Sequence, residues 1–135
     1  MKRANYLGAP QVFRLNHACR LINDALGGTC YLVGSSLERR DFRDVDVRLM
    51  LSDEDFDRLF FGTPESQWNA RWSFLCMTTS TWLREQTGLP VDFQIQRATE
   101  ANAKHEGQRQ PLGFFLDYPG DRPREPAINE KEPTP

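Results

Sequence analysis

The chain has 135 residues, of which 39% are hydrophobic and 27% are charged, and its formal net charge is −2. Such a length and composition are typical of one globular domain. The slightly acidic balance argues against a protein that coats nucleic acid, because those proteins are usually strongly basic. No apolar run is long enough to span a membrane, and no signal peptide is recognisable, so we expect a cytoplasmic protein that does not bind a membrane.

The three cysteines, Cys19, Cys30 and Cys76, lie far apart, and each is flanked by apolar residues. We therefore expect small buried side chains in the reduced state. A zinc site would need more paired cysteines and histidines than this chain has, since His17 and His105 are its two histidines.

The first half of the chain predicts one helix and two strands. Residues 11–26 place apolar side chains at steps of three and four, and Gly27 follows, as glycine often does after a helix. Residues 29–33 are short, apolar and β-branched, which favours a buried strand. A helical turn at 35–40 and an alternating strand at 44–51 come next.

The second half predicts two helices, a strand and a further helix. Ser52 is a good N-cap, and we interpret the acids that follow it as a solvated helix start rather than as metal ligands. Residues 66–87 form a long amphipathic stretch, whose tryptophans we assign to the core. Residues 91–96 alternate as a strand, and residues 97–106 are a candidate helix.

The predicted elements form one domain with a tail. Residues 1–117 have the mixture of helices and strands that favours an α/β or α+β fold, with helices flanking a small mixed sheet. Residues 118–135 are rich in proline and charge, so we expect a poorly ordered tail. The polar segment with Lys104, His105 and Arg109 either reaches back over a site or is an exposed linker, and we interpret it as a linker.

Three aspartates fall on predicted strands. Asp44 and Asp46 lie two residues apart, so the period of a strand puts both carboxylates on one face. Asp92 lies in a later strand, and an adjacent strand would place it about 4.8 Å away. Carboxylates this close repel one another without a cation, and Mg²⁺ or Mn²⁺ prefers such oxygen ligands. These acids are therefore a candidate metal site.

A glycine and two serines, Gly34, Ser35 and Ser36, follow directly on the strand predicted at 29–33. Glycine lets a backbone approach a ligand closely, and exposed N–H groups beside a serine hydroxyl suit phosphate oxygens. The position after a buried strand therefore favours a phosphate-binding turn.

Together these motifs resemble the DNA polymerase β-like nucleotidyltransferase superfamily, in particular its minimal members. The resemblance covers residues 29–96 and rests on the sequence GS at 34–35, DVDV at 44–47 and the later Asp92. Two features depart from the family pattern: the spacer before the first aspartate is short and rich in arginine, and no acceptor-binding domain is recognisable. The resemblance implies the nucleotidyltransferase fold.

The resemblance also implies an activity, the transfer of a nucleoside monophosphate from an NTP, with ATP the expected donor, to a hydroxyl acceptor. Two Mg²⁺ or Mn²⁺ ions would bind Asp44, Asp46 and Asp92, and Asp92 would help to deprotonate the acceptor as pyrophosphate leaves. Candidates for binding the phosphates and the leaving group are Gly34, Ser35, Ser36, Arg39, Arg40, Arg43 and Arg48.

Other interpretations stay open. An Asp-x-Asp pair is often only the solvated face of a strand, and glycosyltransferases also use it with Mn²⁺. A minimal member of the family can instead act without catalysis, as an antitoxin-like or nucleotide-sensing module that binds a small helical protein. That function predicts an exposed apolar patch, for example along residues 66–87. The acceptor is equally open: a small alcohol, an RNA end or a protein side chain.

Overall fold

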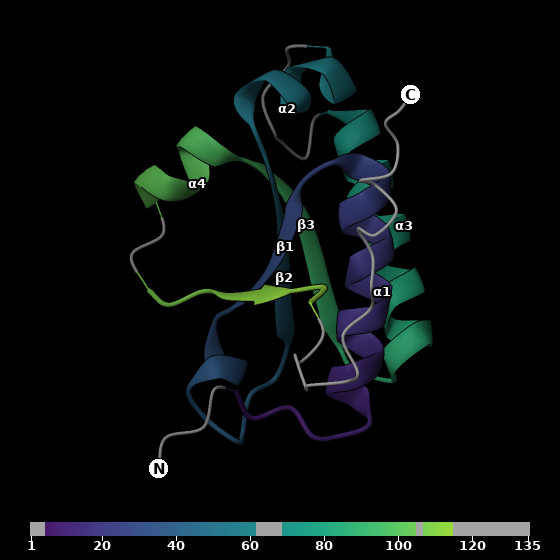
Figure 1. Ribbon diagram of the computed structural model, residues 1–135, viewed down its shortest axis with the longest axis vertical. Coiled ribbons are helices and arrows are strands. Elements are labelled where there is room, and N and C mark those ends of the chain that lie inside the picture. The colour runs from purple at the N-terminus through teal and green to yellow at the C-terminus, as the bar shows by residue number, and fades with distance from the viewer. Residues whose placement is uncertain (1–4, 62–68, 105–106, 115–135) are drawn as a thin grey trace, which may run out of the picture.

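A computed structural model describes residues 5–61, 69–104 and 107–114 of the chain (Figure 1). In chain order its elements are α1 (Gln11–Leu26), β1 (Thr29–Val33), a 3₁₀ turn η1 (Ser35–Leu37), β2 (Val45–Leu51), α2 (Asp53–Phe60), α3 (Ala70–Thr87), β3 (Val91–Arg97), α4 (Ala98–Lys104) and β4 (Gln110–Leu112). The described residues therefore form a mixed α+β domain with a four-stranded sheet and four α-helices.

The four strands form one mixed sheet in the order β3-β2-β1-β4. Strand β1 is antiparallel to both β2 and β4, whereas β2 and β3 are parallel. A parallel pair cannot be joined by a tight turn, and α2 and α3 form the crossover between β2 and β3. The register of this parallel pair aligns Asp46 with Asp92.

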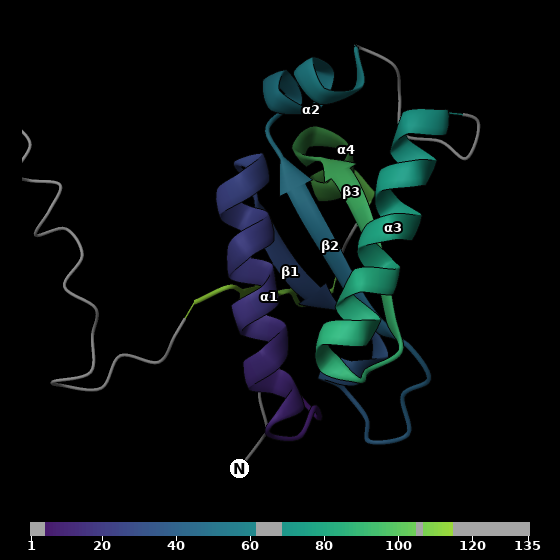
Figure 2. The same ribbon diagram turned by 90° about the vertical axis from the view of Figure 1, so that its right-hand side faces the viewer.

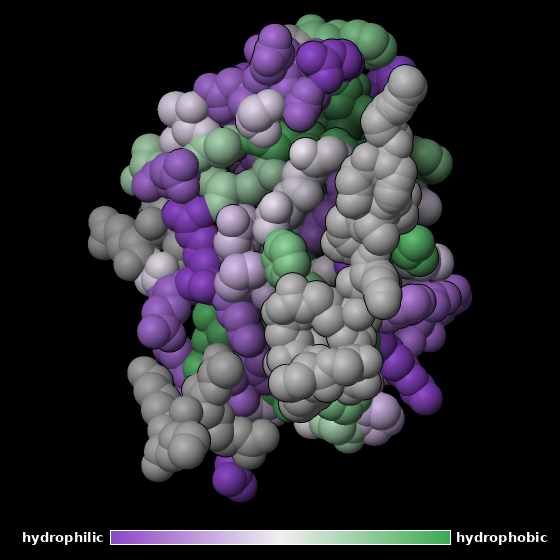
Figure 3. All heavy atoms as spheres, in the orientation of Figure 1, coloured by the Kyte–Doolittle hydropathy of each residue, from purple (hydrophilic) through white to green (hydrophobic). Residues whose placement is uncertain are grey.

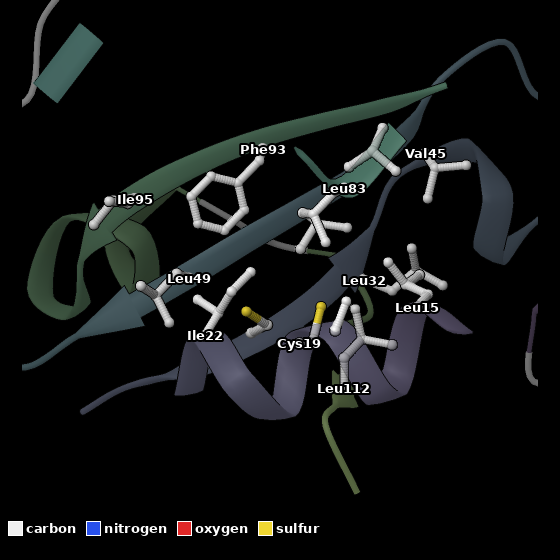
Figure 4. Close-up of a cluster of buried hydrophobic side chains, with 14 of the residues drawn as sticks. Leu15, Cys19, Ile22, Leu32, Val45, Leu49, Leu83, Phe93, Ile95 and Leu112 are labelled. Atoms are coloured by element: carbon white, nitrogen blue, oxygen red, sulfur yellow. The ribbon is translucent and has the colours of Figure 1, made fainter. Parts of the chain in front are cut away.

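Helices α1 and α3 cover one face of the sheet, as Figure 2 shows. Burial alternates along β2 and along β3 as far as Gln96, and the odd-numbered residues of these stretches are buried toward this face. Residues of the core cluster labelled in Figure 4 are Leu15, Cys19, Ile22, Leu32, Val45, Leu49, Leu83, Phe93, Ile95 and Leu112. The even-numbered residues of the two strands lie on the other face, on whose side α4 is found.

Side chains of α3 bond the outer edge of β3, the last strand of the sheet. Trp72 Nε1 and Arg84 Nε donate to two of its carbonyls, at 2.8 and 2.9 Å. Ser80 Oγ accepts a hydrogen bond from the Phe93 N–H at 2.9 Å. The strand residues bonded in this way are Val91, Phe93 and Ile95. Helix α3 therefore supplies partners to backbone groups that an edge strand usually leaves to water or to another chain.

Strand β4 corrects one sequence prediction, because we expected an exposed linker here and residues 110–112 instead pair with β1. Two side-chain amides of α1 hold the C-terminal end of this strand in place. Asn23 Nδ2 donates to the Leu112 carbonyl at 3.0 Å, and Asn16 Oδ1 accepts from the Gly113 N–H at 2.9 Å. The strand is thus fixed by contacts with distant residues rather than by a local pattern.

The helix expected at 11–26 and the strand expected at 29–33 have the predicted ends, whereas several later elements are shifted. The strand expected from Asp44 begins at Val45, so this aspartate precedes β2. The helix expected from residue 66 is described from Ala70 onward, and the side chain of Asn69 caps it.

We expected the acids at the start of α2 to be a solvated helix start, but two of them bond residues of other elements. Asp53 accepts hydrogen bonds from the backbone and hydroxyl of Thr99, and these bonds lower the pKa of its carboxyl. Asp57 forms an ion pair with Arg97 at 2.7 Å. These contacts tie α2 to the end of β3 and to the start of α4.

The three cysteines are buried free thiols, as expected from their apolar neighbours. His17 lies on the exposed side of α1, whereas His105 and the tail at 118–135 lie outside the described residues. Within the described residues, no helix has the length and apolar character needed to cross a membrane.

Candidate functional site

Strands β2 and β3 bring Asp46 and Asp92 together. The two residues are partners in the register of a parallel pair, so their side chains leave the same face of the sheet, away from α1 and α3. Their side chains are 27% and 44% exposed. Both carboxylates are therefore half-buried but open to a ligand.

Arg48 is the cation closest to this pair in the described contacts. Its Nη2 atom lies 3.3 Å from Asp92 Oδ2 and 3.9 Å from Asp46 Oδ1. Its Nη1 atom donates to the carbonyls of Asp92, at 2.8 Å, and of Val47, at 3.1 Å. The backbone bonds fix the guanidinium, and its second nitrogen faces the two carboxylates.

The pKa of Asp46 is raised in spite of this arginine. Burial of the carboxyl is the main cause, and the negative charges of Asp92 and Asp44 raise the pKa further, while Arg48 lowers it. Asp44 is exposed and precedes β2, yet it lies close enough to act on Asp46. Three aspartates and one arginine thus meet at this site, and their unequal numbers favour binding of a further cation.

Gly34 forms one wall of the site, directly after β1. Its φ of 83° and ψ of −158° lie in a region that is open essentially to glycine alone. A Cβ atom built at this position would also collide with the carboxylate of Asp46. Glycine is therefore required here for its conformation and for the space that the aspartate fills.

The two serines after Gly34 lie in the turn η1 and differ in access. Ser35 is half-buried, whereas Ser36 is fully buried and its carbonyl accepts from the Tyr6 N–H at 2.8 Å. Among the described residues, the Ser36 hydroxyl has no hydrogen-bond partner. A buried hydroxyl of this kind is costly, and it would contact a phosphate only if the turn moved.

The arginines of the loop between η1 and β2 are exposed. Arg39 forms an ion pair with Asp41 at 3.3 Å. In the described residues, no ion pair or hydrogen bond joins Arg40 or Arg43 to Asp46 or Asp92. Of the sequence-selected cations, Arg48 is the one brought to the carboxylates.

The described residues contain no group of three acidic, histidine or cysteine side chains arranged to hold a metal ion. Two features account for this: Arg48 occupies the space beside Asp46 and Asp92, and Asp44 lies before the strand begins. No family model, curated protein or solved structure matches this chain. Its function must therefore be argued from the geometry of the site.

Arg109 lies on the same face of the sheet. From the sequence, its segment could either reach back over a site or be an exposed linker, and we had chosen the linker. The segment that leads into β4 carries this arginine to a pocket that Arg48 also lines. In Figure 3, hydrophilic residues run along the side of the molecule where this segment lies, and others are found at the top and on the opposite side. To place Arg109 on this face from the sequence would have required a prediction of β4.

Proposed function

We propose that this chain is a nucleotidyltransferase-fold enzyme, which transfers a nucleoside monophosphate from an NTP to a hydroxyl acceptor with the help of Mg²⁺ or Mn²⁺. The observation that carries the proposal is the alignment of Asp46 with Asp92 beside Gly34, whose missing side chain leaves room for the Asp46 carboxylate. Carboxylate oxygens are the ligands these cations prefer, so the donor set fits.

The chain's own residues have separate roles in this proposal. Asp46 and Asp92 would hold the cations, with Asp44 joining them from the end of the loop. When bound, the cations would neutralise the triphosphate and activate the acceptor hydroxyl. An oxygen of Asp92, the more exposed of the two paired carboxylates, would take the hydroxyl proton.

Gly34 and Ser35 would hold the phosphates at the end of β1. Gly34 is exposed and has no side chain, so its backbone can approach an oxyanion closely. Arg48 only partly compensates Asp46 and Asp92, and its Nη2 faces the place where the phosphates would lie. Its two bonds to backbone carbonyls would keep the guanidinium nearby.

The test compares Asp46→Asn and Asp92→Asn with Asp24→Asn, an exposed control on α1. Thermal melts with and without Mn²⁺-ATP should show metal-dependent stabilisation of the wild type and the control. At a ligand concentration of 100 times Kd, the stabilisation should be about 2.7 kcal/mol. Both site variants should lose it, together with pyrophosphate release in the presence of host extract as the acceptor source. A wild type without metal-dependent nucleotide stabilisation would contradict the proposal.

A second candidate function, binding of a small helical protein without catalysis, is favoured by an apolar patch on α3. Phe74 and Met77, one helical turn apart, are 66% and 69% exposed. Contiguous apolar patches on a protein surface often mark sites of protein–protein interaction. Capture experiments without nucleotide should compare the wild type with a Phe74→Ser/Met77→Ser variant. Loss of a captured protein in this variant, but not in Asp46→Asn, would favour the binding module over the enzyme.

A further inference from the structure

A pocket of about 140 Å³ opens on the polar face of the sheet, beyond Arg48 from the paired carboxylates. Its floor comes from three strands, with Tyr31 of β1, Met50 of β2 and Gln96 of β3, and Ala101 of α4 also lines it. Arg109 reaches it from the segment before β4. Of the described residues that line this pocket, two are arginines and none is acidic.

Arg109 is half-buried, and its described contacts are all with neutral groups. Its Nη2 atom donates to Asn102 Oδ1 at 2.9 Å, and its Nη1 atom lies 3.3 Å from Met50 Sδ. Its Cζ atom lies 5.9 Å from the centre of the Tyr31 ring. An arginine stays charged at any physiological pH, and a charge held away from water without a counter-ion is costly.

Two other arginines of the domain show what Arg109 lacks. Arg48 faces Asp46 and Asp92, and Arg97 pairs with Asp57 at 2.7 Å. Within the described residues, Arg109 has no carboxylate partner. A guanidinium in a pocket without an acidic lining residue is a ready partner for a ligand's oxyanion, which it can bind through two parallel N–H groups.

We propose that this pocket binds the phosphate or carboxylate group of the acceptor, with Arg109 as the residue that recognises it. The inference rests on the proposed function, because the pocket adjoins its carboxylates. Along β2 the pocket residues Arg48 and Met50 lie two and four positions beyond Asp46, about 7–13 Å of strand. The acceptor is therefore a small hydroxyl compound with an anionic group at its other end. The triphosphate would lie at Gly34, on the other side of the paired carboxylates from this pocket.

The direct test is a titration of inorganic phosphate into the full chain, without metal or nucleotide, followed by NMR of the arginine Nε–Hε groups. The wild type should give saturable shifts at Arg109. Arg109→Gln should bind phosphate about tenfold more weakly or worse, whereas Arg109→Lys, which keeps the charge, should have intermediate affinity. Arg14→Gln, an exposed control on α1, should match the wild type. Equal phosphate binding by wild type and Arg109→Gln would overturn the proposal.

A second arm identifies the source of the anion. Saturating Mg²⁺-ATP should leave phosphate bound at Arg109, because acceptor and donor occupy the site together. Displacement of phosphate by ATP would show that Arg109 binds the nucleotide itself, and would overturn the assignment to the acceptor. Asp46→Asn should lose ATP binding and keep phosphate binding. Failure of the pocket and failure of the metal site therefore give different results.

Discussion

The two faces of the sheet are built from the same strands, yet they carry opposite chemistry. Toward α1 and α3, the odd-numbered residues of β2, and those of β3 from Val91 to Ile95, are apolar and fully or almost fully buried. On the other face, Asp46, Arg48 and Asp92 crowd together, and Arg109 lies nearby without an acidic partner among the described residues. One face stabilises the fold, whereas the other holds charges whose burial costs stability and which a ligand could use.

The largest expected effect is on the free energy of unfolding, and it distinguishes the two faces at neighbouring residues of β3. Phe93 is 1% exposed and packs in the core, so Phe93→Ala should lower the free energy of unfolding by about 3–5 kcal/mol. Gln94 lies on the polar face, and Gln94→Ala should change it by about 0.5 kcal/mol or less. Urea unfolding of the two variants measures the difference. Similar losses would show that the polar face also carries the stability of the fold.

A medium effect is expected where a polar group enters the apolar face. Ser80 is buried, and its hydroxyl accepts from the N–H of Phe93 and donates to its carbonyl at 3.4 Å. Ser80→Ala would leave these backbone groups without their partner, and should cost about 1–3 kcal/mol in urea unfolding. Thr81→Ala, at the adjacent exposed position, is the control and should be nearly neutral. A neutral Ser80→Ala would mean that water replaces the hydroxyl.

The smallest effect on the free energy of unfolding is expected for Asp46→Asn, which should not destabilise the fold as the other substitutions do. Because the pKa of Asp46 is raised by folding, the folded chain binds this proton more tightly than the unfolded chain. The ionised carboxylate therefore costs stability at neutral pH, and the cost disappears as the pH falls through the folded-state pKa. Asp46→Asn should be as stable as the wild type at pH 7, or more stable by about 1 kcal/mol at most. The difference should shrink toward pH 4.

Denaturant unfolding at several pH values, without metal, checks this prediction. Asp41→Asn removes an exposed charge from the preceding loop and serves as the control. A variant Asp46→Asn that is clearly less stable at pH 7 would mean that attraction to Arg48 outweighs burial and repulsion, and that the polar face is not strained.

The strongly periodic segments could be predicted from the sequence, because their pattern is local. The helix at 11–26 and the strand at 29–33 begin and end where the apolar steps and the glycines indicate. Strand β4 could not be predicted in this way. It pairs with β1, and the bonds from Asn23 to Leu112 and from Gly113 to Asn16 join residues that are 89 and 97 positions apart in the sequence.

The candidate site, like the fold, could be predicted from the sequence only where its pattern is local. A period of two places Asp46 and Arg48 on one face of β2, but only the pairing of β2 with β3 brings Arg48 to Asp92. The burial of Ser36 could not be predicted from the sequence, because the packing of its turn depends on Tyr6. Residue types and strand period thus indicate a site, whereas the counter-charges in it depend on tertiary contacts.

The bonds from α3 to the backbone of β3 bear on self-association. An unprotected edge strand can template a neighbouring copy and start a growing aggregate, but the carbonyls of Val91 and Ile95 and the N–H of Phe93 already have partners. At the opposite end of the sheet, β4 is three residues long and contains Pro111, which has no N–H to offer. Within the described chain, neither end of the sheet invites runaway β-stacking, so a partner protein would dock through side chains rather than by adding a strand.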